Sequence, residues 1–216
     1  MRSFAIRYTS LFALFLTAGC FTHRLGDPVA TRFHDDGRAK PIAVIPTMID
    51  TTSFDVPWSI AEELTNSIVQ AVGTSGQIYI KPSEEFAVIE NPFGGDLSWT
   101  KTEFSGQQFA VFLELVEHEL TPVASQKSQE EPRGHYLHMG VRVRVIDIRG
   151  EEPKIVLQEV VRDSYYIPKS FFPPNYQITC WGCDEYVKTP LGIAHARLAQ
   201  EVSGRVTDYI LLAQNR

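Results

Sequence analysis

The chain has 216 residues, of which 44% are hydrophobic and 21% are charged, as in a globular protein rather than a membrane bundle. Its formal net charge is −6, and it contains no long cluster of Lys and Arg. This acidic composition argues against nucleic acid as a partner. The length suits one domain of ordinary size with a substantial core.

The first twenty residues have the pattern of an export signal. Arg2 and Arg7 precede a short apolar run, and small residues follow it. The run is too short to cross a bilayer as a helix, which needs about 20 residues. The end of this segment, Ala18-Gly19-Cys20, resembles the lipobox of bacterial lipoproteins, although Thr17 stands where leucine is usual. The resemblance implies cleavage before Cys20 and attachment of acyl chains to it. The alternative is an ordinary cleaved signal in which Cys20 is incidental.

The sequence is thus divided into a signal peptide (1–19), a flexible tether (20–40) and a single domain (41–216). The tether has few apolar residues, several charges and two glycines, which favours an extended, poorly ordered segment. Phe21 follows the cysteine. In enterobacterial lipoproteins an Asp there retains the protein in the inner membrane, so this resemblance implies the outer membrane, with the domain facing the periplasm.

The first half of the domain predicts a β-α-β unit. The apolar run 41–46 is expected to be a buried strand, and residues 77–80 a second short strand. Between them, Pro57 is expected in the first turn of an amphipathic helix. Apolar residues recur along that helix every four residues, at Ile60, Leu64, Ile68 and Val72. Residues 81–105 are expected to be irregular, and within them 86–89 fit either a short strand or the start of a helix.

The second half predicts three long antiparallel strands and a final helix. The strands are expected at 109–120, 136–148 and 155–167, with a polar loop at 123–134. Residues 137, 139, 141, 143 and 145 are apolar and define the buried face of the middle strand. Thr189 and Pro190 are expected to begin a helix of about six turns. The predicted fold is a two-layer α/β sandwich, a mixed sheet of about five strands with two long helices on one face.

Two short phrases within this pattern resemble a superfamily of bacterial envelope lipoproteins. The phrases are residues 41–46, which open the domain, and residues 145–150 in the long hairpin. Members include the curli secretion channel subunit and the lipoprotein activator of penicillin-binding proteins. The resemblance implies a non-catalytic α/β domain that binds other envelope proteins.

Cys180 and Cys183 have the spacing of a thiol–disulfide active site. In thioredoxin-like proteins such a pair opens a helix, which lowers the pKa of the first cysteine. Here the pair lies in a predicted loop and is followed by Asp184 and Glu185, which disfavour a thiolate. A structural disulfide, free thiols and a redox site all remain open.

The histidines do not predict a metal site. His135 and His138 are three residues apart, so on a strand they face opposite sides of the sheet. They and His118 are therefore expected to be exposed strand histidines. No catalytic or phosphate-binding motif occurs in the sequence, and no cofactor is expected.

A segment rich in aromatic residues is the candidate for partner binding. Aromatic side chains concentrated in a loop often anchor protein interfaces. The alternative is that they form a satellite core at the end of the sheet. The candidates are Tyr165, Tyr166, Phe171, Phe172, Tyr176 and Trp181.

These patterns together favour a lipoprotein that is not an enzyme. Its expected partners are the membrane, through the acyl chains, and another envelope protein for which it acts as adaptor or assembly factor. A disulfide oxidoreductase that uses the two cysteines is one alternative. A structural lipoprotein of the outer membrane, which could assemble as a homo-oligomer, is another.

Overall fold

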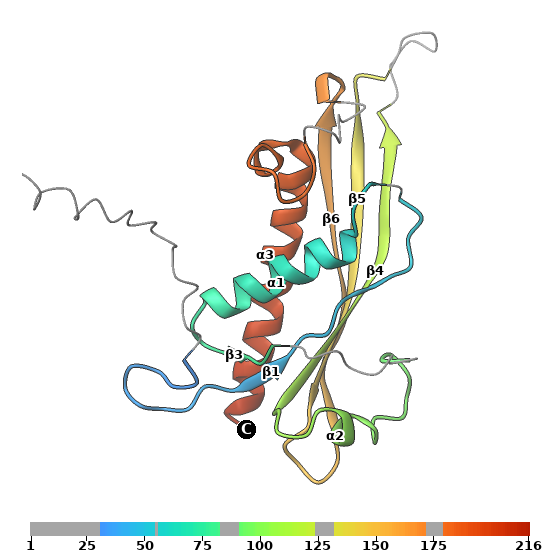
Figure 1. Cartoon of the computed structure of the whole chain (residues 1–216). Helices are drawn as coiled ribbons and strands as arrows, with labels where there is room; N and C mark the ends of the chain where they lie inside the picture. The colour runs from blue at the N-terminus through green and yellow to red at the C-terminus, as the bar shows by residue number, and fades with distance from the viewer. Residues whose placement is uncertain (1–30, 55, 83–90, 124–131, 172–178) are drawn as a thin grey trace, which may run out of the picture.

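The computed structural model describes residues 31–54, 56–82, 91–123, 132–171 and 179–216. Six strands form one sheet, and the predicted α/β fold with helices packed on one face of a mixed sheet is confirmed (Figure 1). The strands are β1 (Ile42–Val44), β2 (Ile49–Asp50), β3 (Tyr79–Ile80), β4 (Phe109–Pro122), β5 (Gly134–Asp147) and β6 (Lys154–Pro168).

The sheet combines a short parallel part with a long antiparallel part. Its order is β3-β1-β4-β5-β6, and β2 pairs with β4 beside β1. β1 runs parallel to both β3 and β4, as the predicted β-α-β unit requires. The three long strands are antiparallel, with one irregularity in register between Leu115 and Glu117. At about 3.3 Å per residue, β4 extends roughly 46 Å.

Two ends of the long strands are used below as reference points. The base is the end where Phe109 lies opposite Asp147. The tip is the opposite end, where Thr121 pairs with Tyr136 and Tyr136 pairs with Tyr166. β1 pairs with the first residues of β4, so the chain enters the sheet at its base.

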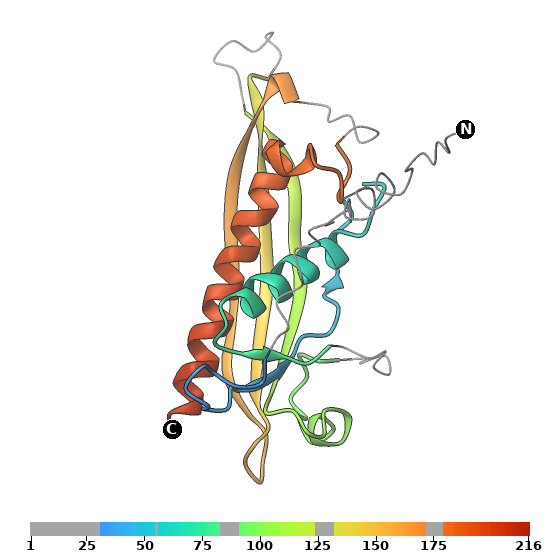
Figure 2. The same ribbon diagram turned by 60° about the vertical axis from the view of Figure 1, so that its left-hand side comes forward.

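The helices α1 (Ile60–Thr74) and α3 (Pro190–Gln214) cover one face of the sheet, and α3 runs along the long strands (Figure 2). Thr189 caps α3 by accepting a hydrogen bond from the amide of Gly192, as predicted. The predicted start of α1 at Pro57 was three residues early. The side chain of Ser59 caps this helix by accepting from the amide of Glu62, so the first turn begins at Ile60.

The main core lies between the helices and the inner face of the sheet. The predicted apolar face of β5 is buried there, including Leu137, Met139 and Val141. The apolar stripe of α1, from Ile60 to Val72, packs on the same core. Alternation along the strand and a four-residue period along the helix therefore identified the correct faces.

In the part of the chain that the structure describes, the outer face of the sheet is covered near its base. Residues 91–105, which were expected to be irregular, contain a short helix, α2 (Thr100–Glu103), on the side away from α3 (Figure 1). A second cluster of apolar residues packs there, including Phe104 and Phe112. Arg144 holds the segment in place, because its guanidinium donates to the carbonyl oxygens of residues 92, 93 and 94 at 2.6–3.0 Å. Residues 86–89 lie outside the described residues.

Two further segments differ from expectation. Residues 31–40 were assigned to an extended tether, but Phe33 and Ala39 pair as an antiparallel bridge within a small turn. The Arg32 guanidinium lies 5.7 Å from the centre of the Tyr79 ring, so this turn packs against β3. Ile49 and Asp50 form the short strand β2, which sequence reasoning missed.

Among the residues described, no helix is both long and apolar enough to cross a membrane.

Candidate functional site

The aromatic candidates for partner binding are divided between the core and the surface. Tyr165 and Trp181 pack against the main core. Tyr166 is 41% exposed and Phe171 is 51% exposed, and both lie near the tip. Phe172 and Tyr176 lie outside the described residues. Adjacent strand residues face opposite sides of a sheet, which explains why Tyr165 is covered and Tyr166 is not.

The outer face at the tip joins polar and aromatic side chains from all three long strands. The rings of Tyr136 and Tyr166 meet edge to face, with centres 5.6 Å apart. Next to them, His138 Nε2 is 2.8 Å from the Thr121 hydroxyl, and His138 Nδ1 is 2.8 Å from the Ser164 hydroxyl. We call these five residues the tip face. Tyr136 was not among the candidates, because its alternation with Leu137 was interpreted only as a buried-face pattern.

Beneath the helices lies a buried polar network that sequence reasoning missed. Glu63 of α1 and His195 of α3 are both 2% exposed, and Glu63 Oε1 lies 2.8 Å from His195 Nδ1. The same carboxylate accepts hydrogen bonds from the Tyr186 hydroxyl at 2.6 Å and from the Trp58 indole at 2.8 Å. One buried carboxylate therefore joins α1, α3 and the segments that precede both helices.

His118 extends this network to the sheet. Its Nε2 is 2.8 Å from the Nε2 of His195, and the residue is only 4% exposed. The prediction of an exposed strand histidine was therefore wrong. Burial, and secondarily the nearby His195, lowers the pKa of His118 from 6.5 to about 3. Glu63, His118, Tyr186 and His195 are each at most 4% exposed, so this network joins elements rather than presenting a site to solvent.

Among the described residues there is no group of three or more His, Cys, Asp or Glu side chains arranged to hold a metal ion. His138 lies on the outer face, bonded as described above, and His135 pairs with Ile167, which points to the core. The two histidines therefore face opposite sides of the sheet, as their spacing requires.

Cys180 and Cys183 form a disulfide in the structure, with their Cα atoms 5.7 Å apart. The backbone amide of Cys183 donates to the carbonyl of Cys180, and the amide of Tyr186 donates to the carbonyl of Cys183. The disulfide turn is thus joined directly to the residue that donates to Glu63. Helix α3 begins only at Pro190, so the cysteines do not open that helix.

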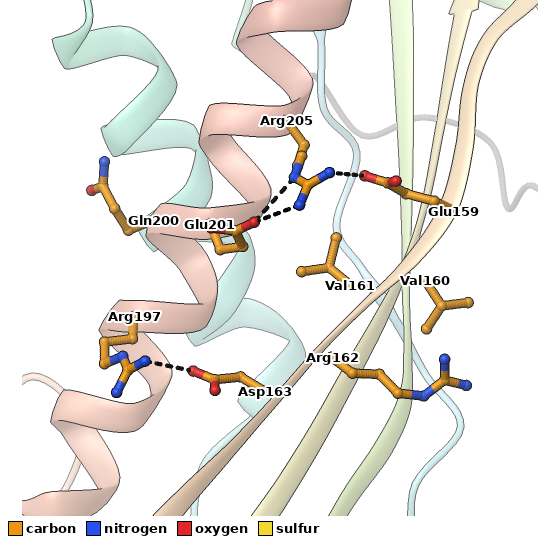
Figure 3. Close-up of a pocket in the computed structure, with 9 residues that line it drawn as sticks. All are labelled: Glu159, Val160, Val161, Arg162, Asp163, Arg197, Gln200, Glu201 and Arg205. Atoms are coloured by element: carbon orange, nitrogen blue, oxygen red, sulfur yellow. Dashed lines mark hydrogen bonds and ion pairs between the residues drawn. The ribbon is translucent and has the colours of Figure 1, made fainter.

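A groove of about 660 Å³ lies between α3 and β6 (Figure 3). Val161, Glu159 and Asp163 point toward α3, whereas Val160 and Arg162 point away from it (Figure 3). Two ion pairs cross the groove. Arg197 lies 3.6 Å from Asp163, and Arg205 lies 3.8 Å from Glu159.

Comparison with known proteins identifies the family. A model described as "Family of unknown function (DUF7499)" matches residues 29–214, nearly the whole chain. The chain belongs to DUF7499. No curated protein sequence matches this DUF7499 chain. The match begins at residue 29, so it includes the turn at 31–40 that the sequence had assigned to the tether.

A solved structure from Chlamydia trachomatis shares the fold of the DUF7499 chain, and two others show weaker similarity. The hypothetical protein CT253 from Chlamydia trachomatis is 21% identical, with a TM-score of 0.65 over 80% of this chain and 98% of that one. Protein XCC0632 from Xanthomonas campestris is 8% identical, with a TM-score of 0.46 over 83% and 90% of the two chains. Uncharacterized lipoprotein B from Nitrosomonas europaea is 11% identical, with a TM-score of 0.39 over 79% and 84%.

Proposed function

We propose that this protein is a lipoprotein of the bacterial outer membrane, anchored through acylated Cys20, whose periplasmic domain binds another envelope protein without catalysis. The anchor is supported by the basic start, the short apolar run and the lipobox-like Ala18-Gly19-Cys20. The acyl chains are the expected membrane attachment, because an acidic protein is not attracted to anionic lipid.

The observation that supports partner binding best is the tip face. No helix of the described residues covers this part of the sheet, and two tyrosines there are each more than 40% exposed. Large aromatic side chains of this kind anchor protein interfaces and lose little conformational entropy on binding. The neighbouring hydroxyls and imidazole supply directional hydrogen bonds around them.

The position of the tip also suits an adaptor. The chain enters the sheet where Ala43 lies beside Phe109, whereas Tyr136 lies beside Thr121, twelve residues farther along β4. At about 3.3 Å per residue, the tip face is roughly 40 Å from the entry point. The eleven steps from Cys20 to Thr31 span at most about 36–40 Å when fully extended. The tether joins the domain at the base, so the tip face is at the far end of the sheet from the anchor and is available to a partner.

The cysteine pair favours a structural role over a redox role. Reactive thiols are stabilised by a helix N-terminus or by nearby positive charge. Cys183 is separated from the start of α3 by six residues and is followed by Asp184 and Glu185. The backbone hydrogen bonds of this turn hold Tyr186 against the buried network instead.

The anchor is tested by replacing the cysteine that receives the acyl chains. We expect Cys20→Ser to yield unacylated precursor that no longer fractionates as a mature lipoprotein. Mass spectrometry of the N-terminal peptide and metabolic labelling with a fatty acid measure this directly. Normal processing of the variant, with membrane retention unchanged, would refute acylation at Cys20.

The tip face is tested by replacing its two tyrosines together. We expect Tyr136→Ser with Tyr166→Ser to reduce partner capture roughly tenfold or more, because central aromatic anchors contribute most of an interface's energy. Capture is measured by crosslinking in cells and copurification from detergent-solubilised envelope. The thermal midpoint should change little, since both rings are exposed.

Leu212→Ser is the matched control, because this residue is also exposed, at 57%, but lies near the C-terminal end of α3. If the double tyrosine variant and Leu212→Ser capture the partner equally well, the tip face is not the partner-binding surface. Recovery of only the protein itself, at a fixed stoichiometry, would instead support a homo-oligomeric structural lipoprotein.

A further inference from the structure

β6 is a long strand with one edge open in the described part of the molecule. It has 15 residues and pairs with β5 along its whole length, while no other described strand pairs with its outer edge. Such an edge exposes backbone amide and carbonyl groups that can pair with another strand. Near the tip, the amide of Ser164 donates to the side chain of Asp163 at 2.8 Å rather than to a strand.

A helix flanks this open edge. The groove of about 660 Å³ is bounded by β6 on one side and by α3 on the other (Figure 3). Protein domains that bind extended peptides by strand addition use the open edge of a sheet, with pockets for alternate side chains. The volume lies within the range of about 300–1,000 Å³ that is usual for binding sites.

The two walls of the groove are in register. Arg197 and Arg205 are eight residues apart on α3, which corresponds to about 12 Å along a helix. Asp163 and Glu159 are four residues apart on β6, which corresponds to about 13 Å along a strand. Each arginine therefore faces one carboxylate, at 3.6 and 3.8 Å. These separations exceed hydrogen-bond length, so the pairs can rearrange around an inserted chain.

The charges of the groove define the occupant. Three carboxylates (Glu159, Asp163 and Glu201) and three arginines (Arg162, Arg197 and Arg205) line the groove, so their charges balance and the position of each charge, not the sum, selects the occupant. Residues directly opposite one another in neighbouring strands are stabilised by opposite charge and destabilised by like charge. An added strand is therefore favoured when basic residues lie opposite Asp163 and Glu159, and an acidic residue lies opposite Arg162 on the other face.

We infer that this groove binds an extended segment of a partner protein, which adds to β6 as an antiparallel strand. Read from its N-terminus to its C-terminus, the segment has the charge pattern basic-acidic-x-x-basic. Its five residues lie opposite residues 163, 162, 161, 160 and 159 of β6, in that order. This site is separate from the tip face, and its binding does not depend on the proposed anchor or on the tip tyrosines.

The test uses the protein as purified from cells in detergent, with the capped synthetic peptide TVKEVTKVT as probe. Binding is measured by fluorescence anisotropy, and the bound site by hydrogen exchange of individual backbone amides. We expect saturable binding with increased protection of the β6 amides between residues 158 and 164. Glu159→Lys with Asp163→Lys should weaken binding at least about tenfold. The peptide TVEEVTEVT, which reverses only the two charges opposite residues 163 and 159 and keeps the glutamate opposite Arg162, should recover most of the loss.

Glu151→Lys with Glu152→Lys is the matched control, because it makes the same change in net charge in the exposed turn between β5 and β6. It should leave binding of TVKEVTKVT within about twofold of the wild type, since exposed charges at this distance are largely screened at physiological salt. If this control variant loses as much binding as the groove variant, net charge alone explains the effect and the proposal is overturned.

Modified probes test strand addition on the unmodified protein, so the test does not depend on how the variants fold. Two probes carry N-methyl groups on alternate amides, one on the amides that face β6 and the other on the amides that face away from it. The first probe should not bind, and the second should still bind. Equal binding of both methylated probes, or binding without added protection of β6, would overturn the proposal. In that case the edge charges serve only to prevent aggregation.

Discussion

Replacing Glu63 with alanine is expected to lower the free energy of unfolding by about 3–5 kcal/mol, because it removes one partner of a buried ionisable pair. The Glu63 carboxylate lies 2.8 Å from His195 Nδ1, and the two side chains are 3% and 2% exposed. It also accepts hydrogen bonds from the Tyr186 hydroxyl and the Trp58 indole. The variant removes the acceptor that these three groups share. Equilibrium unfolding in urea, with the slope and the midpoint fitted together, measures the change.

The adjacent Glu62→Ala is the matched control. Glu62 is exposed on the same turn of α1, and the cap from Ser59 uses its backbone amide rather than its carboxylate. Only a few tenths of a kcal/mol are expected from its loss near the helix N-terminus. A Glu63→Ala variant no less stable than Glu62→Ala would show that the network does not hold α1 and α3 together.

The second large effect is a loss of stability at mildly acidic pH. In the unfolded chain His118 takes up a proton as the pH falls through about 6.5, whereas in the folded protein burial holds its pKa at about 3. Between these values the unfolded state binds more protons, so the free energy of unfolding falls as the pH falls, by up to about 1.4 kcal/mol per pH unit. The contribution of His118 is fully present above pH 6.5 and is lost progressively toward pH 3.

Urea unfolding at intervals from pH 7 to pH 5 measures this slope above the range in which most carboxylates titrate. His118→Gln should remove most of it, because the amide can still bond to His195 but does not titrate. His138→Gln, a change in a surface histidine bonded to Thr121 and Ser164, should leave the slope unchanged. Equal slopes for both variants and the wild type would show that His118 is protonated similarly in the folded and unfolded states.

The parts of the fold that follow from local periodicity could be predicted from the sequence. Alternation along β5 and the four-residue repeat along α1 each identify a single apolar face, and burial by the other layer confirms both. The start of α1 was misplaced because Pro57 is a good first-turn residue, yet the hydrogen bond from Glu62 to Ser59 decides the boundary. Local signals compete there, and the side-chain cap prevails.

The buried network could not be predicted, because its members come from distant parts of the chain. Glu63 and His195 are 132 residues apart, and His118 and His195 are 77 apart. His118 was interpreted within its own strand, where a histidine between two glutamates is usually exposed. One signal was available: His195 lies between Ala194 and Leu198 on the apolar stripe of the final helix.

Neither the groove nor the burial of Arg144 could be predicted from the sequence, because both depend on which elements become neighbours. Alternation places Arg144 on the outer face of β5, but only the covering segment at 92–94 makes it buried. Similarly, the sequence predicts a strand at 155–167 and a final helix without indicating that they lie side by side at a sheet edge. The ion pairs that cross the groove, such as Arg197–Asp163, follow from that arrangement.

The position of α3 after all the described strands has a consequence for how the protein folds. Chains are synthesised from the N-terminus, so α3 becomes available only after the sheet, whereas the inner face of β5 and the network residue Glu63 depend on it. Contacts over more than 100 residues form slowly, since a long loop must first be closed. Until the last helix docks, the apolar side of a sheet about 46 Å long stays open to water and to other chains. Newly made protein is thus most prone to aggregation in the interval before α3 is complete.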